Sequence, residues 1–378
     1  MFWFVFFTFI GVYTAMQAFF YVSVCRAYSP GRWARAGLAG LLALTVVAPI
    51  WSRLLDKAGH EWLSRGLGIM GYTWMVLVFW FCCLGILFAI WNGAVRTAAT
   101  VRPGLRRLVL SRRTVVGISM VLLLAGTCWG LIEASRIQVK QVRIRTPRLP
   151  AGSEPVRVVQ ISDVHIGRPR GYRFVQKLVD LLKEQRPDIL VSTGDLTDTA
   201  LLHRPELSAA FRELNPPLGK YAVTGNHDYY ADLDRSLAFH RASGFRVLRG
   251  EWVRASHNLY IAGVDDPAGT YTGQRSNLDE EMLLKAIDPA AFVILLKHQP
   301  KLKAAAVNRF DLQLSGHTHG GQVFPFQVLV RLLYPFISGM HRVSDRSLVY
   351  VNRGTGVWGA PLRVLAPAEI TVFILEPQ

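Results

Sequence analysis

The chain has 378 residues, of which 51% are hydrophobic and 18% are charged, and its formal net charge is +17. This composition is too apolar for an ordinary soluble enzyme, and the length allows two or three domains. Residues 1–133 hold 12 basic and 3 acidic residues and the remainder holds 31 and 23, so much of the charge flanks apolar segments and we expect no nucleic-acid partner.

Four runs near the N-terminus contain no Asp, Glu, Lys or Arg: residues 1–25, 36–52, 66–95 and 114–132. Because a helix needs about 20 apolar residues to cross a bilayer, we expect a region of four transmembrane helices over residues 1–133. Pro49 and the short second run leave open a three-span variant or a tilted second helix. The first run lacks the basic start and the cleavage site of a signal peptide, so we expect it to remain as an anchor.

The loop between the third and fourth runs carries six arginines between Arg96 and Arg113. Arginine-rich loops normally face the cytoplasm, so we expect an integral protein of the plasma (inner) membrane whose C-terminal domain is extracytoplasmic. That orientation places nine flanking basic residues inside and seven outside. All four cysteines lie in or beside the spans, which excludes a disulfide framework or a cysteine metal site downstream.

The soluble part divides into a linker and one domain. Residues 134–155 contain Pro147, Pro150 and Gly152 and are predicted to form a short linker, although their first part is strand-like. From residue 156 to 378, short apolar runs alternate at first with a helical pattern over 174–182, which predicts an α/β domain. Later runs have fewer helices between them, so we expect mixed β-sheets, two of them stacked and sandwiched by helices.

Several of these predicted strands end in polar motifs. Asp163 and His165 follow the run 156–161 and, two residues apart in an extended stretch, point the same way and suit one metal ion. Asp195 follows a strand and Gly194, and its two oxygens can bridge two ions. Either motif alone is common by chance.

Two further motifs are more specific. In Gly225-Asn226-His227-Asp228, the amide oxygen of Asn226 is a neutral ligand, His227 can donate a proton, and Asp228 can fix the tautomer of that imidazole. In Gly316-His317-Thr318-His319-Gly320-Gly321, two histidines share a glycine-rich turn. Such mixed oxygen and nitrogen shells suit two divalent ions about 3.5–4 Å apart.

The order of these motifs, together with Lys297-His298, resembles the calcineurin-like metallophosphoesterase family over roughly residues 156–376. The sequence Gly-His-Thr-His-Gly-Gly-Gln ending at Gln322 and the tail Asn352-Arg353-Gly354-Thr355-Gly356 with Pro361-Leu362-Arg363 and Pro367-Ala368-Glu369-Ile370 look like the membrane-associated branch related to UDP-diacylglucosamine hydrolases.

The resemblance implies the calcineurin-like fold, two divalent metal ions (Mn, Fe or Zn) and a role for each motif residue. One ion would be bound by Asp163, His165 and His319, and the other by Asn226, His298 and His317. Asp195 would bridge the two ions. His227 would protonate the leaving oxygen, and Asp228 would orient His227.

These expectations favour an integral-membrane phosphohydrolase that cleaves a phosphodiester or pyrophosphate bond, with an amphiphilic, lipid-linked substrate such as a UDP-diacylglucosamine-like molecule. The alternatives are a membrane-tethered phosphatase or phosphodiesterase for soluble substrates and a non-catalytic metal-binding scaffold. The intact set of motif residues opposes the scaffold, and transport fits poorly because the spans contain no ionisable residue.

Two residues outside the motifs are candidates for substrate contact. Arg353 follows an apolar run and precedes a glycine turn, so it is a candidate phosphate ligand or an ion-paired arginine. His341 is a weaker candidate. The remaining histidines, which have no metal-like neighbours, are expected to be ordinary surface or core residues: His60, His203, His240 and His257.

Residues 323–340 directly follow the last histidine motif and are unusually apolar for a catalytic loop. Two interpretations are open: a helix packed on the core, or a surface that enters the bilayer interface beside the site and admits an acyl or prenyl chain.

Overall fold

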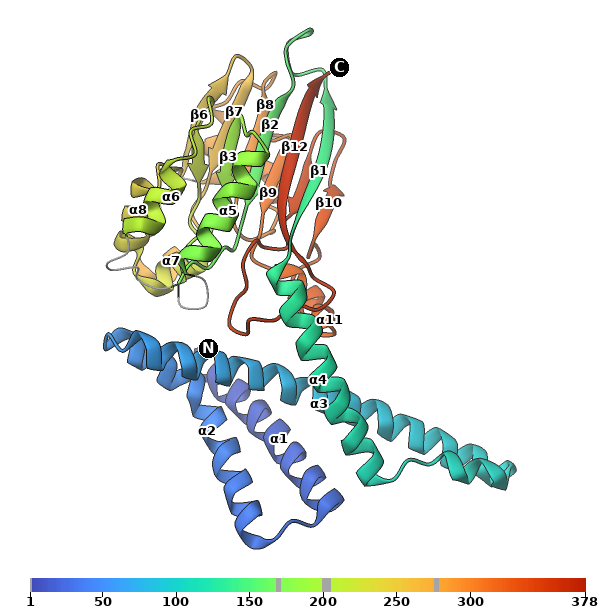
Figure 1. The fold of residues 1–378 in the computed structure, drawn as a ribbon. Coiled ribbons are helices and arrows are strands. Elements are labelled where there is room, and N and C mark those ends of the chain that lie inside the picture. Colours follow the sequence, from blue (N-terminus) through green and yellow to red (C-terminus); the bar gives the residue numbers. More distant parts are fainter. Residues whose placement is uncertain (1, 168–170, 199–204, 275–278) are drawn as a thin grey trace. The chain divides into compact units, whose positions relative to one another are not determined.

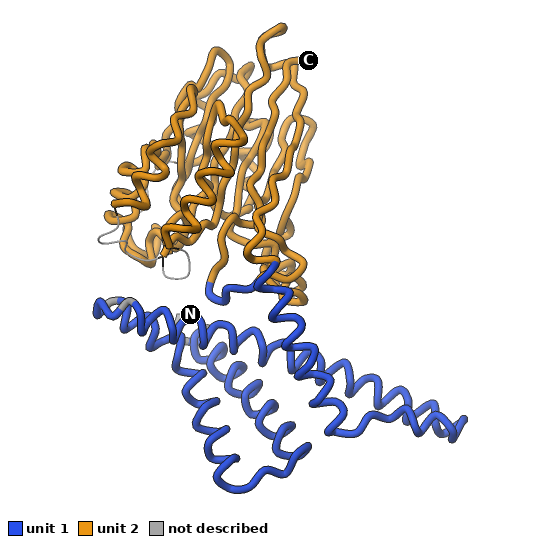
Figure 2. The backbone as a smooth tube through the Cα atoms, in the orientation of Figure 1, with its two compact units in different colours: residues 1–132, 359–362 blue, residues 133–358, 363–378 orange. Residues whose placement is uncertain are grey.

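A computed structural model of the chain describes residues 2–167, 171–198, 205–274 and 279–378 (Figure 1). His203 lies outside the described residues. The chain forms two compact units, one of residues 1–132 and 359–362 and the other of residues 133–358 and 363–378 (Figure 2).

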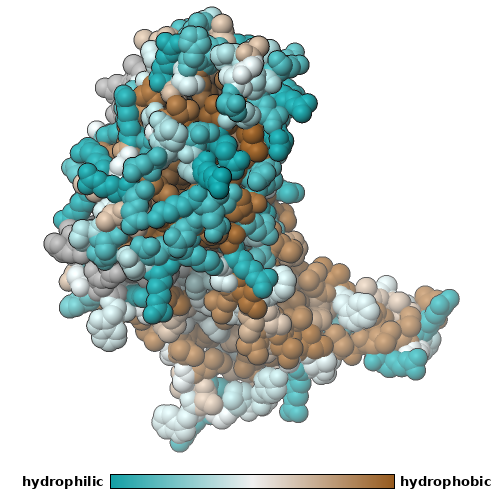
Figure 3. All heavy atoms as spheres, turned by 45° about the horizontal axis from the view of Figure 1, so that its top comes forward, coloured by the Kyte–Doolittle hydropathy of each residue, from teal (hydrophilic) through white to brown (hydrophobic). Residues whose placement is uncertain are grey.

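The first unit is helical. Its elements are α1 (Phe2–Tyr28), α2 (Arg32–Lys57), α3 (Glu61–Val101), the 3-10 helix η1 (Pro103–Leu108) and α4 (Arg112–Ser135), the end of which reaches into the second unit. Four of these helices are long and apolar enough to cross a membrane, in agreement with the four spans expected from the sequence. Brown, apolar side chains dominate their surface, whereas the second unit is largely teal (Figure 3).

The second unit contains two six-stranded mixed sheets, as the sequence predicts. The first sheet has the order β1-β12-β2-β3-β4-β5 and the second the order β10-β11-β9-β8-β7-β6. The strands are β1 (Ile137–Thr146), β2 (Val156–Ile161), β3 (Ile189–Ser192), β4 (Lys220–Ala222), β5 (Arg246–Val247), β6 (Glu251–Ser256), β7 (Leu259–Gly263), β8 (Phe292–Leu296), β9 (Leu312–Ser315), β10 (Gly339–Arg342), β11 (Leu348–Val351) and β12 (Ala368–Pro377).

Helices cover the outer faces of both sheets, as Figure 1 shows for α5, α6 and α8 on the first sheet. The helices of this unit are α5 (Tyr172–Glu184), α6 (Pro205–Arg212), α7 (Asn226–Ala231), α8 (Leu233–Ala242), α9 (Ala268–Thr272), α10 (Glu280–Lys285), η2 (Ala304–Ala306), η3 (His319–Gly321) and α11 (Phe326–Leu333).

Side chains alternate between the layers because successive strand residues point to opposite faces. Val158 of β2 lies in the core between the two sheets, and its neighbour Val159 lies in the core beneath α5 and α6. In β8, Ile294 faces the first sheet and Val293 packs in the core that includes α10. Strands that are buried on both faces therefore have continuous apolar runs in the sequence.

The stretch assigned to a linker contains a strand of the first sheet. β1 pairs in parallel with β12 along its whole length, from Ile137 with Ala368 to Thr146 with Pro377. Its exposed polar residues alternate with partly buried ones such as Val142, and Ile144 is buried, as expected for an edge strand with one solvent face. The domain boundary placed at residue 156 stays a prediction.

Candidate metal centre

The polar motifs follow the carboxyl ends of parallel strands. Asp163 comes two residues after β2, Asp195 three residues after β3 and His298 two residues after β8. β2 and β3 are parallel neighbours in the first sheet, and β8 and β9 in the second. Open α/β sheets bind ligands outside the carboxyl ends of their strands. In this protein, the polar motifs of both sheets converge at those ends.

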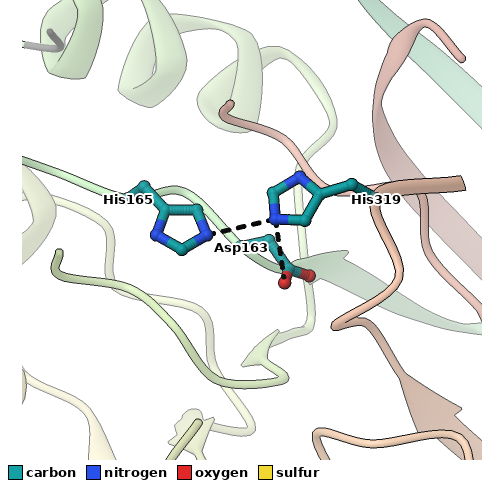
Figure 4. A group of neighbouring side chains, drawn as sticks. All are labelled: Asp163, His165 and His319. Atoms are coloured by element: carbon teal, nitrogen blue, oxygen red, sulfur yellow. Dashed lines mark hydrogen bonds and ion pairs between the residues drawn. The ribbon is translucent and has the colours of Figure 1, made fainter. Parts of the chain in front are cut away.

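One group of side chains consists of Asp163, His165 and His319 (Figure 4). The Nε2 atoms of His165 and His319 lie 3.1 Å apart, and Nε2 of His319 lies 3.5 Å from Oδ1 of Asp163. All three residues are buried. Two imidazole nitrogens and a carboxylate that converge in this way suit a divalent cation.

A second group brings together Asn226, His298 and His317. The amide oxygen of Asn226 lies 2.9 Å from Nδ1 of His317 and 3.2 Å from Nε2 of His298. Nδ1 of His298 lies 2.8 Å from the carbonyl oxygen of Thr193. A proton on Nδ1 donated to that carbonyl leaves Nε2 free as a ligand, which is how histidine ligands are usually oriented.

Asp195 lies between the two groups. Its Oδ2 atom is 3.2 Å from Nε2 of His298 and 3.9 Å from Nε2 of His165. Its Oδ1 atom accepts a hydrogen bond from the backbone N–H of His227 at 2.8 Å. The carboxylate is therefore oriented toward both groups at once.

The burial of these side chains and their closeness to one another shift their pKa values. Burial raises the pKa of Asp163 above its ordinary value. Burial also lowers the pKa of His317 to about 3 and, with the nearby His165 and Arg363, holds the pKa of His319 well below its usual range. Neutral imidazoles are the form that binds metal, so His317 and His319 are in the form that suits a divalent cation.

Five of the seven predicted ligands have left-handed backbone conformations that non-glycine residues rarely adopt: Asp163, His165, Asp195, His317 and His319, with φ between 49° and 71°. Asp163 and His165 are thus not in an extended stretch, and it is this local turn rather than strand alternation that aims both side chains inward. Such strained residues cost about 1–3 kcal/mol each and cluster at functional sites.

Two glycines allow the strand ends to approach each other closely. A Cβ atom at Gly225 would overlap the carboxylate of Asp195, and one at Gly316 would overlap the side chains of Ser162 and Asp163. The glycines of both motifs are therefore required for space.

The structure pairs His227 with Asp198 rather than with Asp228. Nδ1 of His227 lies 2.6 Å from Oδ1 of Asp198. Asp228 instead accepts a hydrogen bond from the backbone N–H of Gly225 at 2.8 Å and lies 3.6 Å from Nε2 of His240. Asp228 thus holds the start of α7, and Asp198 is the carboxylate that lies against Nδ1 of His227; the role of Asp228 as the residue that orients His227 stays a prediction.

Sequence reasoning missed Asp198, although a second carboxylate three residues after Asp195 was a visible signal. Burial opposes its charge, but hydrogen bonds from His165 and His227 outweigh burial and lower the pKa of Asp198. An ionised Asp198 can accept the Nδ1 proton of His227.

Tyr334 is a second residue that the sequence did not single out for the metal site. Its hydroxyl lies 2.7 Å from Nε2 of His317, and the rings are 5.1 Å apart. With Nε2 of His317 bonded to this hydroxyl, Nδ1 points to Asn226 and His298. Tyr334 thus orients a candidate ligand from outside the ligand group.

The two candidates for substrate contact lie outside the ligand groups. The Arg353 guanidinium forms an ion pair with the buried carboxylate of Glu369 at 2.6 Å, which favours the ion-paired interpretation. His341 stacks against Phe336, with ring centroids 4.6 Å apart, and Nε2 lies 3.0 Å from the carbonyl oxygen of Ser338. Substrate contact by either residue stays a prediction.

The other described histidines are not ligands in either group. His60 precedes α3, and His257 lies in a turn beside Arg254. His240 is fully buried near Asp228.

Comparisons with known proteins agree with this geometry. Residues 156–321 match the family model described as calcineurin-like phosphoesterase. An uncharacterized metallophosphoesterase of Aquifex aeolicus is 40% identical over 65% of this chain and 94% of its own length. A transmembrane protein with metallophosphoesterase domain of Danio rerio is 32% identical over 85% of this chain and 76% of its own length.

Among solved structures, the likeness is weaker. A dimetal phosphatase from Danio rerio is 14% identical, with a TM-score of 0.36, and the match covers 53% of this chain and 88% of that protein.

Proposed function

Because the chain belongs to the calcineurin-like metallophosphoesterase family, whose members are metal-dependent phosphoesterases, we propose that it is a binuclear phosphohydrolase of the membrane. It would cleave a phosphodiester or pyrophosphate bond in an amphiphilic, lipid-linked substrate of the UDP-diacylglucosamine type. The observation that carries the binuclear assignment is the position of Asp195, whose Oδ2 atom lies between the imidazoles of His298 and His165.

Each ligand group would hold one divalent ion. Asp163, His165 and His319 would bind the first, and Asn226, His298 and His317 the second, with Asp195 shared. When bound, the ions would neutralise charge on the phosphoryl oxygens and activate water. His227 would hold a proton at Nε2 for the leaving oxygen, while Asp198 stabilises the imidazolium through Nδ1.

An amphiphilic substrate is supported by the four candidate spans and by the apolar segment that follows the last histidine motif. Anchoring the site at a bilayer raises its encounter with lipids and does little for a soluble ester. An extracytoplasmic position of the catalytic unit in the plasma membrane is supported by the arginine-rich loop, which includes η1.

The test uses purified full-length protein loaded with Mn²⁺, Fe²⁺ or Zn²⁺, with bound metal counted by mass spectrometry. We expect two ions per chain in the native protein, and we expect Asp195→Asn to lose metal and turnover together, since one carboxylate serves both ions. Full metal content and full rate in Asp195→Asn would rule out the binuclear assignment.

The substrate class is tested with the same preparation. Bis-p-nitrophenyl phosphate reports the phosphodiesterase chemistry, and lipid pyrophosphates and lipid phosphodiesters in mixed micelles report the preference for an amphiphile. We expect kcat/KM to be higher for lipid substrates than for water-soluble esters with the same leaving group. Equal values would favour a membrane-tethered enzyme for soluble substrates.

A further inference from the structure

The helix α11 presents apolar side chains to the exterior of the catalytic unit. None of its eight residues is buried. The exposed fractions are 79% for Leu332, 75% for Leu333 and 59% for Val328. A helix that packs on the core has its apolar residues inside, so the core-helix interpretation of residues 323–340 is wrong for α11, although Val323 and Ile337 on either side of it are buried.

Gln327, on the polar side of α11, contacts the protein instead. The side-chain amide of Gln327 donates a hydrogen bond to the carbonyl oxygen of Leu365 at 3.0 Å, and Gln327 packs closely over Gly321. The apolar residues Val328, Leu329, Leu332 and Leu333 occupy the opposite arc. This inverted amphipathic pattern is typical of a surface that has an apolar environment outside the protein.

The contacts of α11 indicate that this environment is a bilayer. The residues just before α11 are hydrogen-bonded to the segment around Val364. The backbone N–H of Phe324 donates to the carbonyl oxygen of Val364 at 3.1 Å. The next two residues, Leu365 and Ala366, donate their backbone N–H groups to the carboxylate of Glu133 at 3.3 and 2.9 Å. Glu133 lies in the last turn of α4, the fourth candidate span, and belongs to the same compact unit as α11. The helix is therefore tied to the end of a candidate membrane span.

Basic groups lie near this apolar surface. Arg331 is exposed on α11, and Nζ of Lys301 lies 5.3 Å from the centre of the Tyr334 ring. Interfacial helices combine an apolar face with basic residues that reach anionic lipid headgroups. The charge and the apolar face thus fit the same partner.

We propose that α11 is an interfacial helix that lies in the surface of the bilayer, with Val328, Leu329, Leu332 and Leu333 among the acyl chains. The residue after the helix, Tyr334, contacts His317 of the second ligand group, so membrane contact of α11 holds the metal centre at the level of the headgroups. This inference depends on the membrane anchor and not on the substrate of the enzyme.

The experiment places an environment-sensitive NBD label on the full-length chain, after replacement of Cys25, Cys82, Cys83 and Cys128 by alanine. The label is attached at Leu332→Cys, a position exposed enough that folding is not affected, and at the matched control Met282→Cys on α10, which is 65% exposed. Both proteins are reconstituted into vesicles of phosphatidylcholine and phosphatidylglycerol.

We expect the label at residue 332 to show blue-shifted emission and to lose intensity when the lipids carry doxyl groups on their acyl chains, whereas the label at residue 282 shows neither effect. A label at Arg331→Cys, on the polar edge of the helix, should be quenched less than the label at residue 332.

Emission at residue 332 equal to that at residue 282 would mean that α11 is in water and would overturn the proposal. Blue-shifted emission without quenching by doxyl lipids would mean that protein, such as a second copy of the chain, covers the helix, and would also overturn it. Equal quenching at residues 331 and 332 would contradict the proposed orientation.

Discussion

At the scale of single residues, the centre depends on how each imidazole is oriented. His298 is held by the carbonyl oxygen of Thr193, His317 by the hydroxyl of Tyr334 and His227 by the carboxylate of Asp198. Each of these partners binds one ring nitrogen and leaves the other to face the site. Burial opposes a charge on His298, but Asp195 outweighs burial and raises the pKa of His298 well above its ordinary value.

The pairing of His227 with Asp198 leads to a first prediction. His227→Ala should retain bound metal but lower kcat by about 10²–10⁴-fold for esters with poor leaving groups, which need the proton. Asp198→Asn should lower kcat in the same substrate-dependent way, and Asp228→Asn should not, because Asp228 bonds Gly225. The measurement is kcat across a series of aryl esters. Equal losses for good and poor leaving groups would exclude the acid role.

A second prediction concerns Tyr334. Tyr334→Phe removes the hydroxyl that contacts Nε2 of His317 and should weaken metal binding by roughly 10-fold or more, as loss of outer-shell partners does. Competition with a fluorescent chelator measures the affinity. Tyr172→Phe on α5, which is 48% exposed, is the control. Unchanged affinity in Tyr334→Phe would show that the hydroxyl does not orient the ligand.

At the scale of elements, the ends of β2 and β9 can meet closely because the turn after β9 begins with a glycine. Gly316 follows β9 directly, and its Cα lies against Ser162 and Asp163 after β2. The backbone N–H of His317 donates to both oxygens of Asp163 at 3.0 Å. The turn after β9 thereby fixes the position of a carboxylate from the other sheet.

Gly316→Ala should therefore separate the two strand ends. An overpacked buried site typically costs about 1–3 kcal/mol, so we expect a lower melting temperature and loss of metal from the group that contains Asp163. Gly171→Ala, where the added Cβ meets no atom within 4 Å, serves as the control. Calorimetry and metal analysis are the measurements, and native metal content in Gly316→Ala would contradict this account of the turn.

The strand β1 is the element that the sequence analysis assigned differently. Its proline and glycine neighbours and its many basic residues are typical of a linker, yet it pairs with β12, more than 200 residues later in the chain. The ion pairs of Arg143 and Arg145 with Glu376 cross between these two strands. A partner so distant in sequence leaves no local signal in the pattern of residues 134–155.

At the scale of the whole molecule, the distribution of charge determines the expected orientation in the membrane. The six arginines between Arg96 and Arg113 occupy the end of α3, η1 and the start of α4, and the short loops before and after the other spans carry fewer. Positive loops remain in the cytoplasm, so the end of α4 and the catalytic unit that follows it are expected on the opposite side.

A reporter fused after Gln378 tests this orientation. Alkaline phosphatase, which is active only outside the cytoplasm, should be active in the fusion, and a fluorescent protein that folds only in the cytoplasm should be dark. Two lysines added near Asp56 should weaken the bias, because they lie in a loop expected outside. A bright cytoplasmic reporter in the unmodified fusion would reverse the topology.

The sequence by itself determined the chemistry and the membrane anchor. The motif residues Asp163, Asp195, Asn226 and His319 follow apolar runs, and the ends of parallel strands bring such residues together whatever the loops between them do. The four uncharged runs predict spans from length and composition alone. The mixed, stacked sheets followed from the alternation of strand and helix patterns.

Only the tertiary structure decided the arrangements that depend on contacts between distant segments. The sequence named Asp228 as the partner of His227, whereas the structure brings Asp198 to that imidazole, because the pairing depends on how β3 and β4 end. Likewise, the apolar residues of α11 fit a core helix or an interfacial one, and the side on which Gln327 meets Leu365 turns them outward. The spacing of residues in the sequence fixes which face of a helix is apolar, whereas packing decides whether that face points into the protein or outward.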